Sequence, residues 1–314
     1  MKRSYLFLVL VLISAILSTQ CGRKKNNAKE ISLSGAFAMY PLVVQWAADY
    51  NALHPDVKID ISAGGAGKGI TDVLYDMVDF GMVSREVAPS ELEKGAIAFA
   101  VAKDAVIPTI NADNPVKDVL MAKGMTIQQA KDIWIDGKNE TWGELTESNE
   151  SSPVVVFTRS DACGAAETWA KWLGASQEDL QGTGVFGDPG IAAAVQKNVN
   201  AIGFNNVCYA YDDSTSKPNA NLLVLPIDVD GNGTIDEKED FYDTKDQLIA
   251  AIADGRYPSP PARKLYLVCK GIPQNAVVVD FLKYILTTGQ NSVVPHGYVQ
   301  IDKETIEQQL HQLQ

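Results

Sequence analysis

The sequence predicts an α/β fold, because one pattern recurs three times along the chain. Each copy consists of a short strand, a turn of small residues and an amphipathic helix. The three copies occupy residues 31–53, 57–77 and 154–173. A strand that enters a helix through such a turn leaves the first backbone N–H groups of the helix unpaired. Together with the positive end of the helix dipole, these groups suit an anion.

Length and composition set broad limits on the protein. With 314 residues and 46% hydrophobic content, the chain is large enough for a substantial core in one to three domains. Its formal charge of −12 argues against nucleic acid as a partner and against electrostatic attraction to anionic membranes. An anionic ligand would have to be held by local donors, because the overall field repels it.

The N-terminus carries the pattern of an export signal. Two basic residues precede an apolar run over residues 5–17, which is short for a membrane span. We therefore predict an export signal over residues 1–20, with an uncleaved membrane anchor as the alternative. Cys21 resembles the lipid-modified cysteine of bacterial lipoproteins, and the polar residues 21–30 would form a lipid-anchored tether.

In the first copy of the pattern, residues 31–33 form a short strand and residues 34–38 form the turn. Pro41 suits the first turn of the helix that follows. Apolar residues recur on one face of that helix as far as Leu53.

The second copy has the strongest turn signal. After an alternating strand over residues 57–61, four glycines between Gly64 and Gly69 let the chain turn with almost no side chain in the way. This is not a Walker A loop, because Lys68 is followed by Gly69 rather than by Ser or Thr. Ile70 excludes a dinucleotide fingerprint. A tight turn that binds nothing is the alternative explanation.

Two charged residues stand near these turns. Residues 78–85 read as a buried strand that contains Asp79, whose carboxylate either caps a nearby turn or contacts a ligand. The third copy places Arg159 directly before its turn. Arginine grips an oxyanion with two parallel hydrogen bonds, so Arg159 is the side chain best suited to hold one.

Seven landmarks in this order resemble the phosphate-binding proteins of bacterial ABC-type phosphate importers, across nearly the whole mature chain. They are GAFAMYPL at 35–42, GGAGKGI at 64–70, VDFGMVSR at 78–85, RSDACGA at 159–165, IGF at 202–204, GRYPSPPARKLYLV at 255–268 and the closing helix around Phe281. The resemblance implies a two-lobed, type II periplasmic-binding fold, in which each lobe is a mixed sheet flanked by helices and the ligand lies between the lobes. It implies lobe 1 over residues 31–106, lobe 2 over residues 107–262 and a return to lobe 1 over residues 263–314.

Carried over residue by residue, the resemblance implies an anion site made of three turns, one carboxylate and one guanidinium. Asp79 would accept the proton of a hydrogenphosphate, and Arg159 would be the guanidinium. The complete set is Ala36, Phe37, Ala38, Gly65, Ala66, Gly67, Asp79, Arg159, Cys163, Gly164 and Ala165.

The resemblance also implies the protein's surroundings. Its partners would be phosphate or a similar oxyanion and the permease of an ABC importer. It would be a binding protein rather than an enzyme, and we expect a monomer. It would lie in the periplasm or be anchored outside the inner membrane through a lipid on Cys21.

The chain departs from the family pattern at four positions where the family usually has Ser or Thr. These positions are Ala38, Ala66, Cys163 and Ala165. Each lost hydroxyl removes a donor, and a hydrogen bond to a charged group contributes about 1.5–3 kcal/mol. The backbone amides remain, so phosphate is the first hypothesis. The alternative is a calcium-stabilised envelope protein of the same fold that binds another ligand or a protein partner.

A second motif is independent of that resemblance. Residues 228–239, DVDGNGTIDEKE, match the EF-hand calcium loop at its diagnostic positions. The ligands would be Asp228, Asp230, Asn232, Thr234, Asp236 and Glu239. A strand over residues 222–227 precedes the loop and a helix over residues 244–253 follows it, so the flanks differ from those of an EF-hand. We expect calcium as a cofactor that stiffens one lobe; an acidic surface loop without metal is the alternative.

Three cysteines remain once Cys21 is assigned to the lipid, so at most one internal disulfide can form. They are Cys163, Cys208 and Cys269. Cys163 stands at a helix start near Arg159, where the pKa of a thiol can be lowered, so a cysteine hydrolase is a third hypothesis. It is the least favoured, because no histidine lies within the motifs to act as its base. A weak-donor thiol in a binding turn is preferred.

Overall fold

The computed structural model describes residues 29–138 and 140–314. The predicted export signal over residues 1–20, Cys21 and most of the predicted tether lie outside the described residues. Among the residues described, no helix combines the length and the apolar character that crossing a membrane requires.

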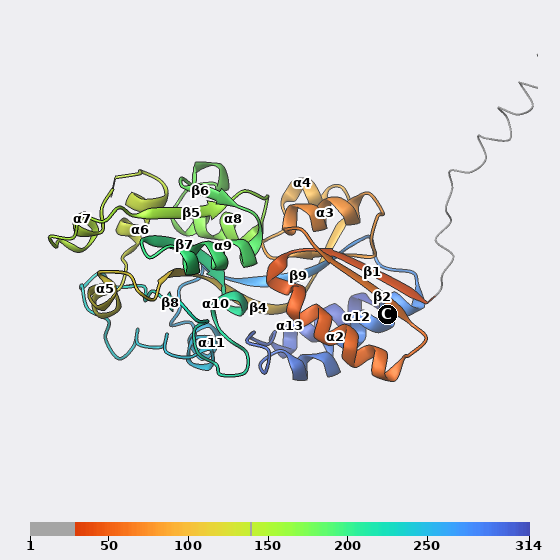
Figure 1. Ribbon diagram of the computed structural model, residues 1–314. Coiled ribbons are helices and arrows are strands. Elements are labelled where there is room, and N and C mark those ends of the chain that lie inside the picture. Colours follow the sequence, from red (N-terminus) through yellow and green to blue (C-terminus); the bar gives the residue numbers. More distant parts are fainter. Residues whose placement is uncertain (1–28, 139) are drawn as a thin grey trace, which may run out of the picture.

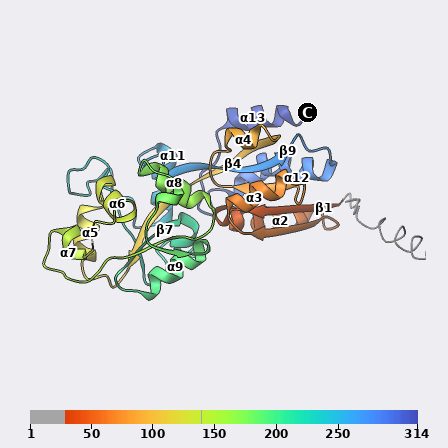
Figure 2. The ribbon, with the colours of Figure 1, turned by 90° about the horizontal axis from the view of Figure 1, so that it is seen from above.

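The chain forms two lobes that are joined by long strands (Figures 1 and 2). A nine-stranded sheet runs through both lobes in the order β2-β1-β3-β9-β4-β7-β5-β6, with β8 paired to β4. The strands are β1 (Glu30–Gly35), β2 (Lys58–Ala63), β3 (Phe80–Val83), β4 (Ala96–Asn111), β5 (Val155–Arg159), β6 (Thr183–Val185), β7 (Ala201–Asn206), β8 (Leu222–Val224) and β9 (Ala262–Lys270). The predicted α/β fold is confirmed.

Helices flank the sheet in each lobe (Figure 1). Lobe 1 contains η1 (Phe37–Met39), α2 (Tyr40–Leu53), α3 (Ala66–Leu74), α4 (Pro89–Leu92), α12 (Ala276–Leu286), η3 (Thr288–Ser292) and α13 (Lys303–Gln312). Lobe 2 contains α5 (Lys117–Lys123), α6 (Ile127–Trp134), α7 (Trp142–Thr146), α8 (Gly164–Trp172), η2 (Gln177–Asp179), α9 (Gly187–Lys197), α10 (Val207–Ala210) and α11 (Lys245–Asp254).

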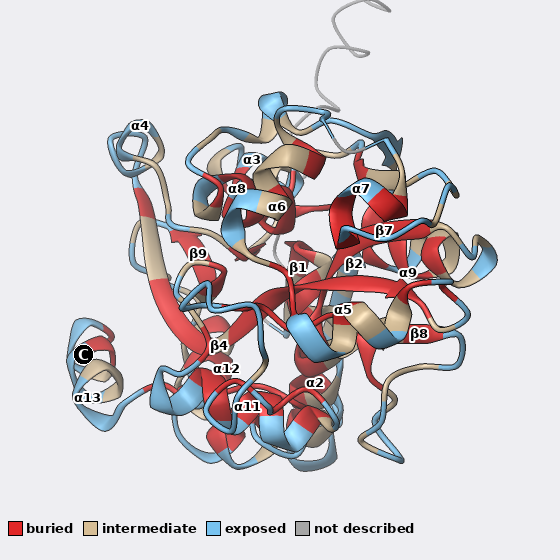
Figure 3. Cartoon of the chain, turned by 90° about the vertical axis from the view of Figure 1, so that its left-hand side faces the viewer, coloured by how far each residue is buried: buried red, intermediate tan, exposed pale blue. Residues whose placement is uncertain are grey.

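In lobe 1, β1 runs parallel to both β2 and β3, so the carboxyl ends of the three strands lie at one edge of the sheet. The helices that follow β1 and β2 begin at this edge. Their apolar faces pack on the sheet around Leu33, Trp46 and Phe281, which are fully buried. Burial of each such side chain contributes about 1.5–3 kcal/mol, which holds the helix beginnings in place. Figure 3 shows most of β4 and β7 as buried backbone at the centre of the molecule.

The strands β4 and β9 connect the lobes. The first part of β4 pairs with β9, and its last part pairs with β7 and β8, always in antiparallel orientation. The register between β4 and β9 shifts between Ala100 and Ala102, as at a β-bulge. Both connections between the lobes are therefore strands of one sheet.

In lobe 2, β5 runs parallel to both β6 and β7, and α8 and α9 follow β5 and β6. The third predicted strand–turn–helix unit is therefore β5 with α8. A fourth unit, β6 with α9, was not predicted. The aromatic rings of Trp134, Trp169 and Phe204 pack together behind α8 and hold this helix on the sheet.

The buried apolar side chains separate into clusters that follow the lobes. The lobe 1 cluster draws on residues 31–102 and 265–313. The clusters of lobe 2 draw on residues 105–262 and, in addition, on Val299. The predicted boundaries lie after residues 106 and 262, within a few residues of these changes.

Candidate anion-binding site

The second and third predicted turns touch each other directly across the two lobes. The backbone N–H of Gly67, at the start of α3, donates to the carbonyl oxygen of Ala162 over 3.1 Å. Gly65 has a φ of +88°, and a Cβ there would lie 2.8 Å from the Ala162 oxygen and 2.9 Å from Oδ2 of Asp161. A side chain at Gly65 would therefore push the two turns apart.

The start of α8 rests on the end of β3. A Cβ at Gly164 would lie 2.2 Å from the carbonyl oxygen of Ser84. Next to it, Nε of Arg85 forms an ion pair of 2.9 Å with Glu167 on α8. Arg85 also pairs with Glu91 of its own lobe over 2.7 Å. The lobes are thus in contact along this side of the site.

The first turn reaches the same region through Phe37. Its backbone carbonyl accepts a hydrogen bond of 3.1 Å from the hydroxyl of Tyr209 in lobe 2. Its ring lies 5.7 Å from Cζ of Arg159 and packs edge-on against the ring of Phe186. A Cβ at Gly187, at the start of α9, would lie 3.1 Å from Cζ of the Phe37 ring. All three predicted turns therefore meet beside Arg159, together with the start of α9.

Arg159 is buried and held by two carboxylates. Its Nε and Nη2 donate to the two carboxylate oxygens of Asp161 over 2.9 and 2.6 Å. Its Nη1 donates to Oδ2 of Asp188 over 2.7 Å. Burial by itself would lower the pKa of Arg159, but the charges of Asp188 and Asp161 raise it above the ordinary value. The guanidinium therefore carries its charge at every physiological pH.

Asp188 is the second residue of α9 and is buried. Its Oδ1 accepts hydrogen bonds from Nδ2 and the backbone N–H of Asn206, at 2.6 and 3.3 Å. Oδ1 of Asp161 accepts another from the backbone N–H of Gly187 at 3.1 Å. The start of α9 thus stabilises both carboxylates. With one cation and two anions, the side chains at this point sum to +1 − 2 = −1.

Backbone N–H groups at the helix starts complete the region. Five of these backbone N–H groups donate to no acceptor within residues 29–138 and 140–314. They belong to Phe37, Ala38, Ala66, Gly164 and Ala165. The N–H of Cys163, by contrast, donates to Oε1 of Gln177 over 3.2 Å. Buried backbone donors are normally paired, so these five are the groups that an oxyanion would satisfy.

Asp79 lies away from the three turns. It precedes β3, whereas the turns lie at the carboxyl ends of the strands. At a strand rise of about 3.3 Å per residue, the end of β3 at Val83 is roughly 13 Å away. Oδ2 of Asp79 accepts hydrogen bonds from the backbone N–H and the Oγ of Ser32, both at 2.8 Å. The prediction that Asp79 contacts the anion is therefore wrong, because its carboxylate faces a neighbouring strand at the other end of the sheet.

Cys163 caps α8, and its Sγ accepts a hydrogen bond of 3.4 Å from the backbone N–H of Ala166. Burial, offset only in part by the charge of Arg159, raises the pKa of the Cys163 thiol to about 12. The thiol is therefore protonated at neutral pH, which removes the thiolate that a cysteine hydrolase requires. Cys163, Cys208 and Cys269 are all free, so the disulfide that the sequence allowed is not formed.

Sequence reasoning missed two carboxylates of this site. Asp161 lies within the RSDACGA landmark but was given no role, and Asp188 lies in the sequence FGDPG at 186–190. That segment carried a usable signal, because Gly followed by Asp-Pro is typical of a helix start. The pairing of Arg159 with Asp188 spans 29 residues and depends on the parallel arrangement of β5 and β6.

The predicted calcium loop lies at the far end of lobe 2, away from the contact between the lobes (Figure 1). The structure brings the carboxylates of Asp228, Asp230 and Glu239 together, with ligand atoms within 4.8 Å of one another. Asp236 lies outside this group of carboxylates. The other predicted ligands, Asn232 and Thr234, lie between them along the same loop.

Two lobes that meet over several helix starts and a buried arginine define a binding protein that encloses its ligand between the lobes. The chain belongs to the PBP superfamily, whose domain model matches residues 23–288. This is a family of binding proteins rather than enzymes, so the comparison, like the protonated thiol of Cys163, opposes the cysteine-hydrolase hypothesis.

Individual relatives agree with this assignment. The chain is 25% identical to the phosphate-binding protein PstS of Xylella fastidiosa, over 93% of this chain and 86% of that protein. It is 26% identical to the phosphate-binding protein PstS of Staphylococcus epidermidis, over 100% and 94% of the two chains. A phosphate ABC transporter substrate-binding protein of Clostridium perfringens, solved with bound phosphate, superposes with a TM-score of 0.70 at 25% identity, over 87% of this chain and 100% of that chain.

Proposed function

We propose that the protein captures inorganic phosphate, or a similar small oxyanion, between its lobes and delivers it to an ABC-type importer. The observation that carries this proposal is the meeting of three helix starts and Arg159 where the lobes touch. Relatives named as phosphate-binding proteins support the choice of ligand.

The donors of the site define how such an anion would be held. Five backbone N–H groups and the charged Arg159 remain after the loss of the hydroxyls. A hydrogen bond to a charged group contributes about 1.5–3 kcal/mol, so three or four of these donors outweigh the repulsion of one net negative charge. The anion is thus bound mainly by neutral amides, while the guanidinium fixes its position.

The carboxylates of Asp161 and Asp188 supply a basis for selectivity. An oxyanion that still carries a proton can donate it to a carboxylate beside Arg159. Sulfate has no proton to donate at neutral pH, so the same carboxylates repel it. Phosphate is therefore favoured over sulfate by the side chains that surround the arginine.

A second candidate is a different ligand or a protein partner on the same fold. Two observations favour it: Ala38, Ala66, Cys163 and Ala165 supply no hydroxyl, and the ring of Phe37 stands 5.7 Å from the Arg159 guanidinium. A ligand with an apolar portion beside its charged group would use that ring.

Isothermal titration with phosphate, sulfate and molybdate at fixed ionic strength tests the proposal. We expect binding of one phosphate per chain, with weaker binding of sulfate and molybdate. Absence of heat with all three anions would favour the second candidate, and tighter binding of sulfate would contradict the role given to the carboxylates. Sedimentation in the same buffers tests the expected monomer.

We further propose that the chain is exported and lipid-anchored through Cys21, outside the cytoplasm. The basic start, the apolar run and the cysteine that follows support this location. Metabolic labelling with radioactive palmitate in the native host, compared with the Cys21→Ala variant, tests it. Label that persists in Cys21→Ala would contradict lipidation at this residue.

A further inference from the structure

The loop over residues 228–239, between β8 and α11, has a backbone shaped by its own side chains. The two carboxylate oxygens of Asp228 accept hydrogen bonds from the backbone N–H groups of Gly231 and Gly233, at 2.7 and 2.9 Å. Gly231 and Gly233 have φ values of +73° and +79°, which side chains rarely adopt. The turn therefore curls around Asp228.

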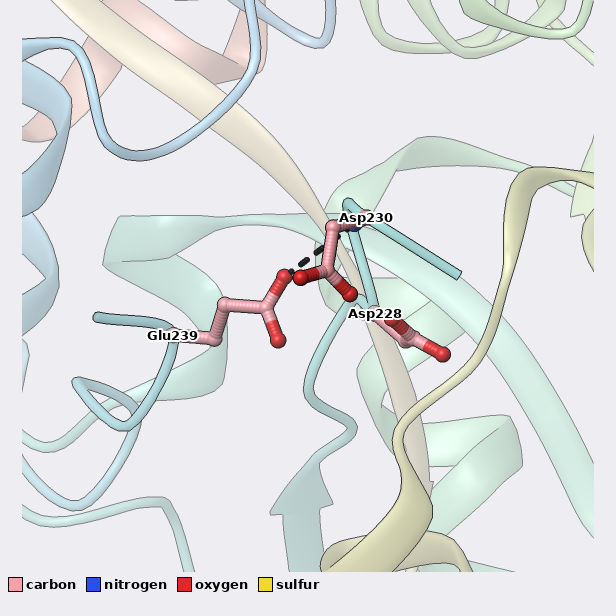
Figure 4. Close-up of side chains that lie close together, drawn as sticks. All are labelled: Asp228, Asp230 and Glu239. Carbon is pink, nitrogen blue, oxygen red and sulfur yellow. Dashed lines mark hydrogen bonds between the residues drawn. The ribbon is translucent and has the colours of Figure 1, made fainter. Parts of the chain in front are cut away.

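Three carboxylates face one another inside this turn. Figure 4 shows Glu239 reaching from the end of the loop toward Asp230 and Asp228 at its start. One oxygen of each lies within 4.8 Å of the others. Asp228 and Glu239 are only 2% and 7% exposed, so water does not screen their charges well.

In the part of the chain that the structure describes, these charges lack a counter-charge. Among residues 29–138 and 140–314, no lysine, arginine or histidine forms an ion pair with Asp228, Asp230 or Glu239. Oε1 of Glu239 accepts the backbone N–H of Val229 at 2.8 Å, but its Oε2 is buried with no hydrogen-bond partner. A buried carboxylate is costly unless it is paired or coordinates a metal.

We propose that this loop binds one calcium ion, independently of the anion site. Side-chain oxygens of Asp228, Asp230 and Asn232 would coordinate it, and Glu239 would bind with both oxygens, including the orphan Oε2. The carbonyl of Thr234 and a water held by Asp236 would complete the shell.

Calcium fits these donors better than other metals. All of them are hard oxygens, without the histidine or thiolate that zinc and copper prefer. The set offers six or seven oxygens from a flexible loop, which suits calcium, whereas magnesium requires a smaller, more rigid octahedron.

The loop is tied to the connection between α5 and α6, which suggests what the ion does. The backbone N–H of Asp228 donates to Met125 over 3.2 Å, and that of Ile235 donates to Ala122 over 3.0 Å. Gly124, with a φ of +70°, lies against the loop at two points, since a Cβ there would be 2.5 Å from Cδ1 of Ile235 and 3.0 Å from the N of Asp228. A bound ion therefore fixes this corner of lobe 2 and leaves the contact between the lobes unchanged.

Calcium titration of the chelator-treated full-length protein tests the proposal, with Glu239→Gln and the matched control Glu237→Gln. Glu237 is exposed and precedes the metal-facing glutamate by two positions. We expect one calcium per chain in the wild type and in Glu237→Gln, at least about tenfold weaker binding in Glu239→Gln, and weaker binding of magnesium. Terbium provides a second readout, because Tyr242, whose hydroxyl accepts the N–H of Ile227 at 3.1 Å, is placed to sensitise its emission.

Circular dichroism without metal shows whether each variant is folded, and the titration of the wild type does not depend on any variant. Absence of calcium binding to the folded wild type would overturn the proposal. Equal losses in Glu239→Gln and Glu237→Gln would overturn the assigned ligands, and equal binding of magnesium would overturn the choice of metal.

Discussion

The contact around Arg159 and the loop at residues 228–239 differ in how their buried charges are balanced. In the contact, one guanidinium is matched by two carboxylates, so every charged side chain has a partner before any ligand arrives. In the loop, three carboxylates gather with no basic partner among the described residues, and one buried oxygen has no hydrogen bond.

The difference indicates what each region needs from a ligand. The loop lacks positive charge, which a metal ion supplies. The contact lacks acceptors for its backbone N–H groups, which an oxyanion supplies although the side chains already sum to a negative charge. Both regions carry a net negative charge, so charge alone would assign a cation to each. The unpaired backbone N–H donors around Arg159 distinguish that region as an anion site.

Of the variants that test this comparison, Arg159→Ala should have the largest effect on phosphate binding and on stability. The variant should lose phosphate binding, because Arg159 is the guanidinium beside which the three turns meet. It should also lose about 3–5 kcal/mol of stability, since Asp161 and Asp188 would be left buried without their partner. Phosphate titration and urea unfolding measure the two effects.

The matched control for this variant is Arg256→Ala in the same lobe. Arg256 pairs with Asp254 at the surface, so we expect a change of less than about 1 kcal/mol and unaltered phosphate binding. Wild-type phosphate affinity in Arg159→Ala would remove the anion site from this position.

Chelation of calcium should produce the next largest effect. At calcium concentrations 100 times the dissociation constant, linkage predicts a stabilisation of about 2.7 kcal/mol. Treatment with EGTA should therefore lower the melting temperature, and added calcium should restore it. The phosphate affinity should remain the same with and without calcium, because the loop is remote from Arg159. A large change in phosphate affinity would show that the two regions are coupled.

Asp188→Asn probes the excess negative charge directly. Removing one of the two carboxylates should raise sulfate affinity roughly tenfold relative to phosphate affinity, because sulfate then meets less repulsion while phosphate loses an acceptor for its proton. Stability should fall by about 1–3 kcal/mol, since Nη1 of Arg159 exchanges a charged acceptor for a neutral one. Asp254→Asn, at the surface of the same lobe, is the control. Equal changes in phosphate and sulfate affinity in Asp188→Asn would contradict the role given to this carboxylate in selectivity.

How much of this the sequence could predict depends on how local each feature is. The helix starts at Ala66 and Gly164 were predictable, because the glycines that form the turns lie next to the strands and helices they join. The carboxylates at 228, 230 and 239 also converge as predicted, since one twelve-residue loop contains them all. Arg159 was found because it adjoins its turn.

The failures come from strand direction and from distant pairing. Asp79 was predicted to contact the anion, but it lies before its strand, whereas the turns lie after their strands. Strand direction therefore puts Asp79 at the opposite end of the sheet. Asp188 reaches Arg159 only because β6 lies beside β5, which no local pattern states. Such features require the topology of the sheet.

The smallest effect is expected for Cys163→Ser, which restores a hydroxyl at the start of α8. The present cap is weak, since Sγ accepts the N–H of Ala166 at 3.4 Å, and serine at an N-cap contributes about 0.5–1 kcal/mol more than a poor cap. Phosphate affinity should also increase, because a hydroxyl is a better donor to an anion than a thiol. Because burial raises the pKa of the Cys163 thiol to about 12, the thiol stays protonated from pH 6 to 9, so wild type and variant should show parallel pH profiles in that range. Phosphate titration and urea unfolding of both proteins measure the affinity and the stability. Reduced phosphate binding in Cys163→Ser would mean that the anion site selects for a ligand that avoids the hydroxyl.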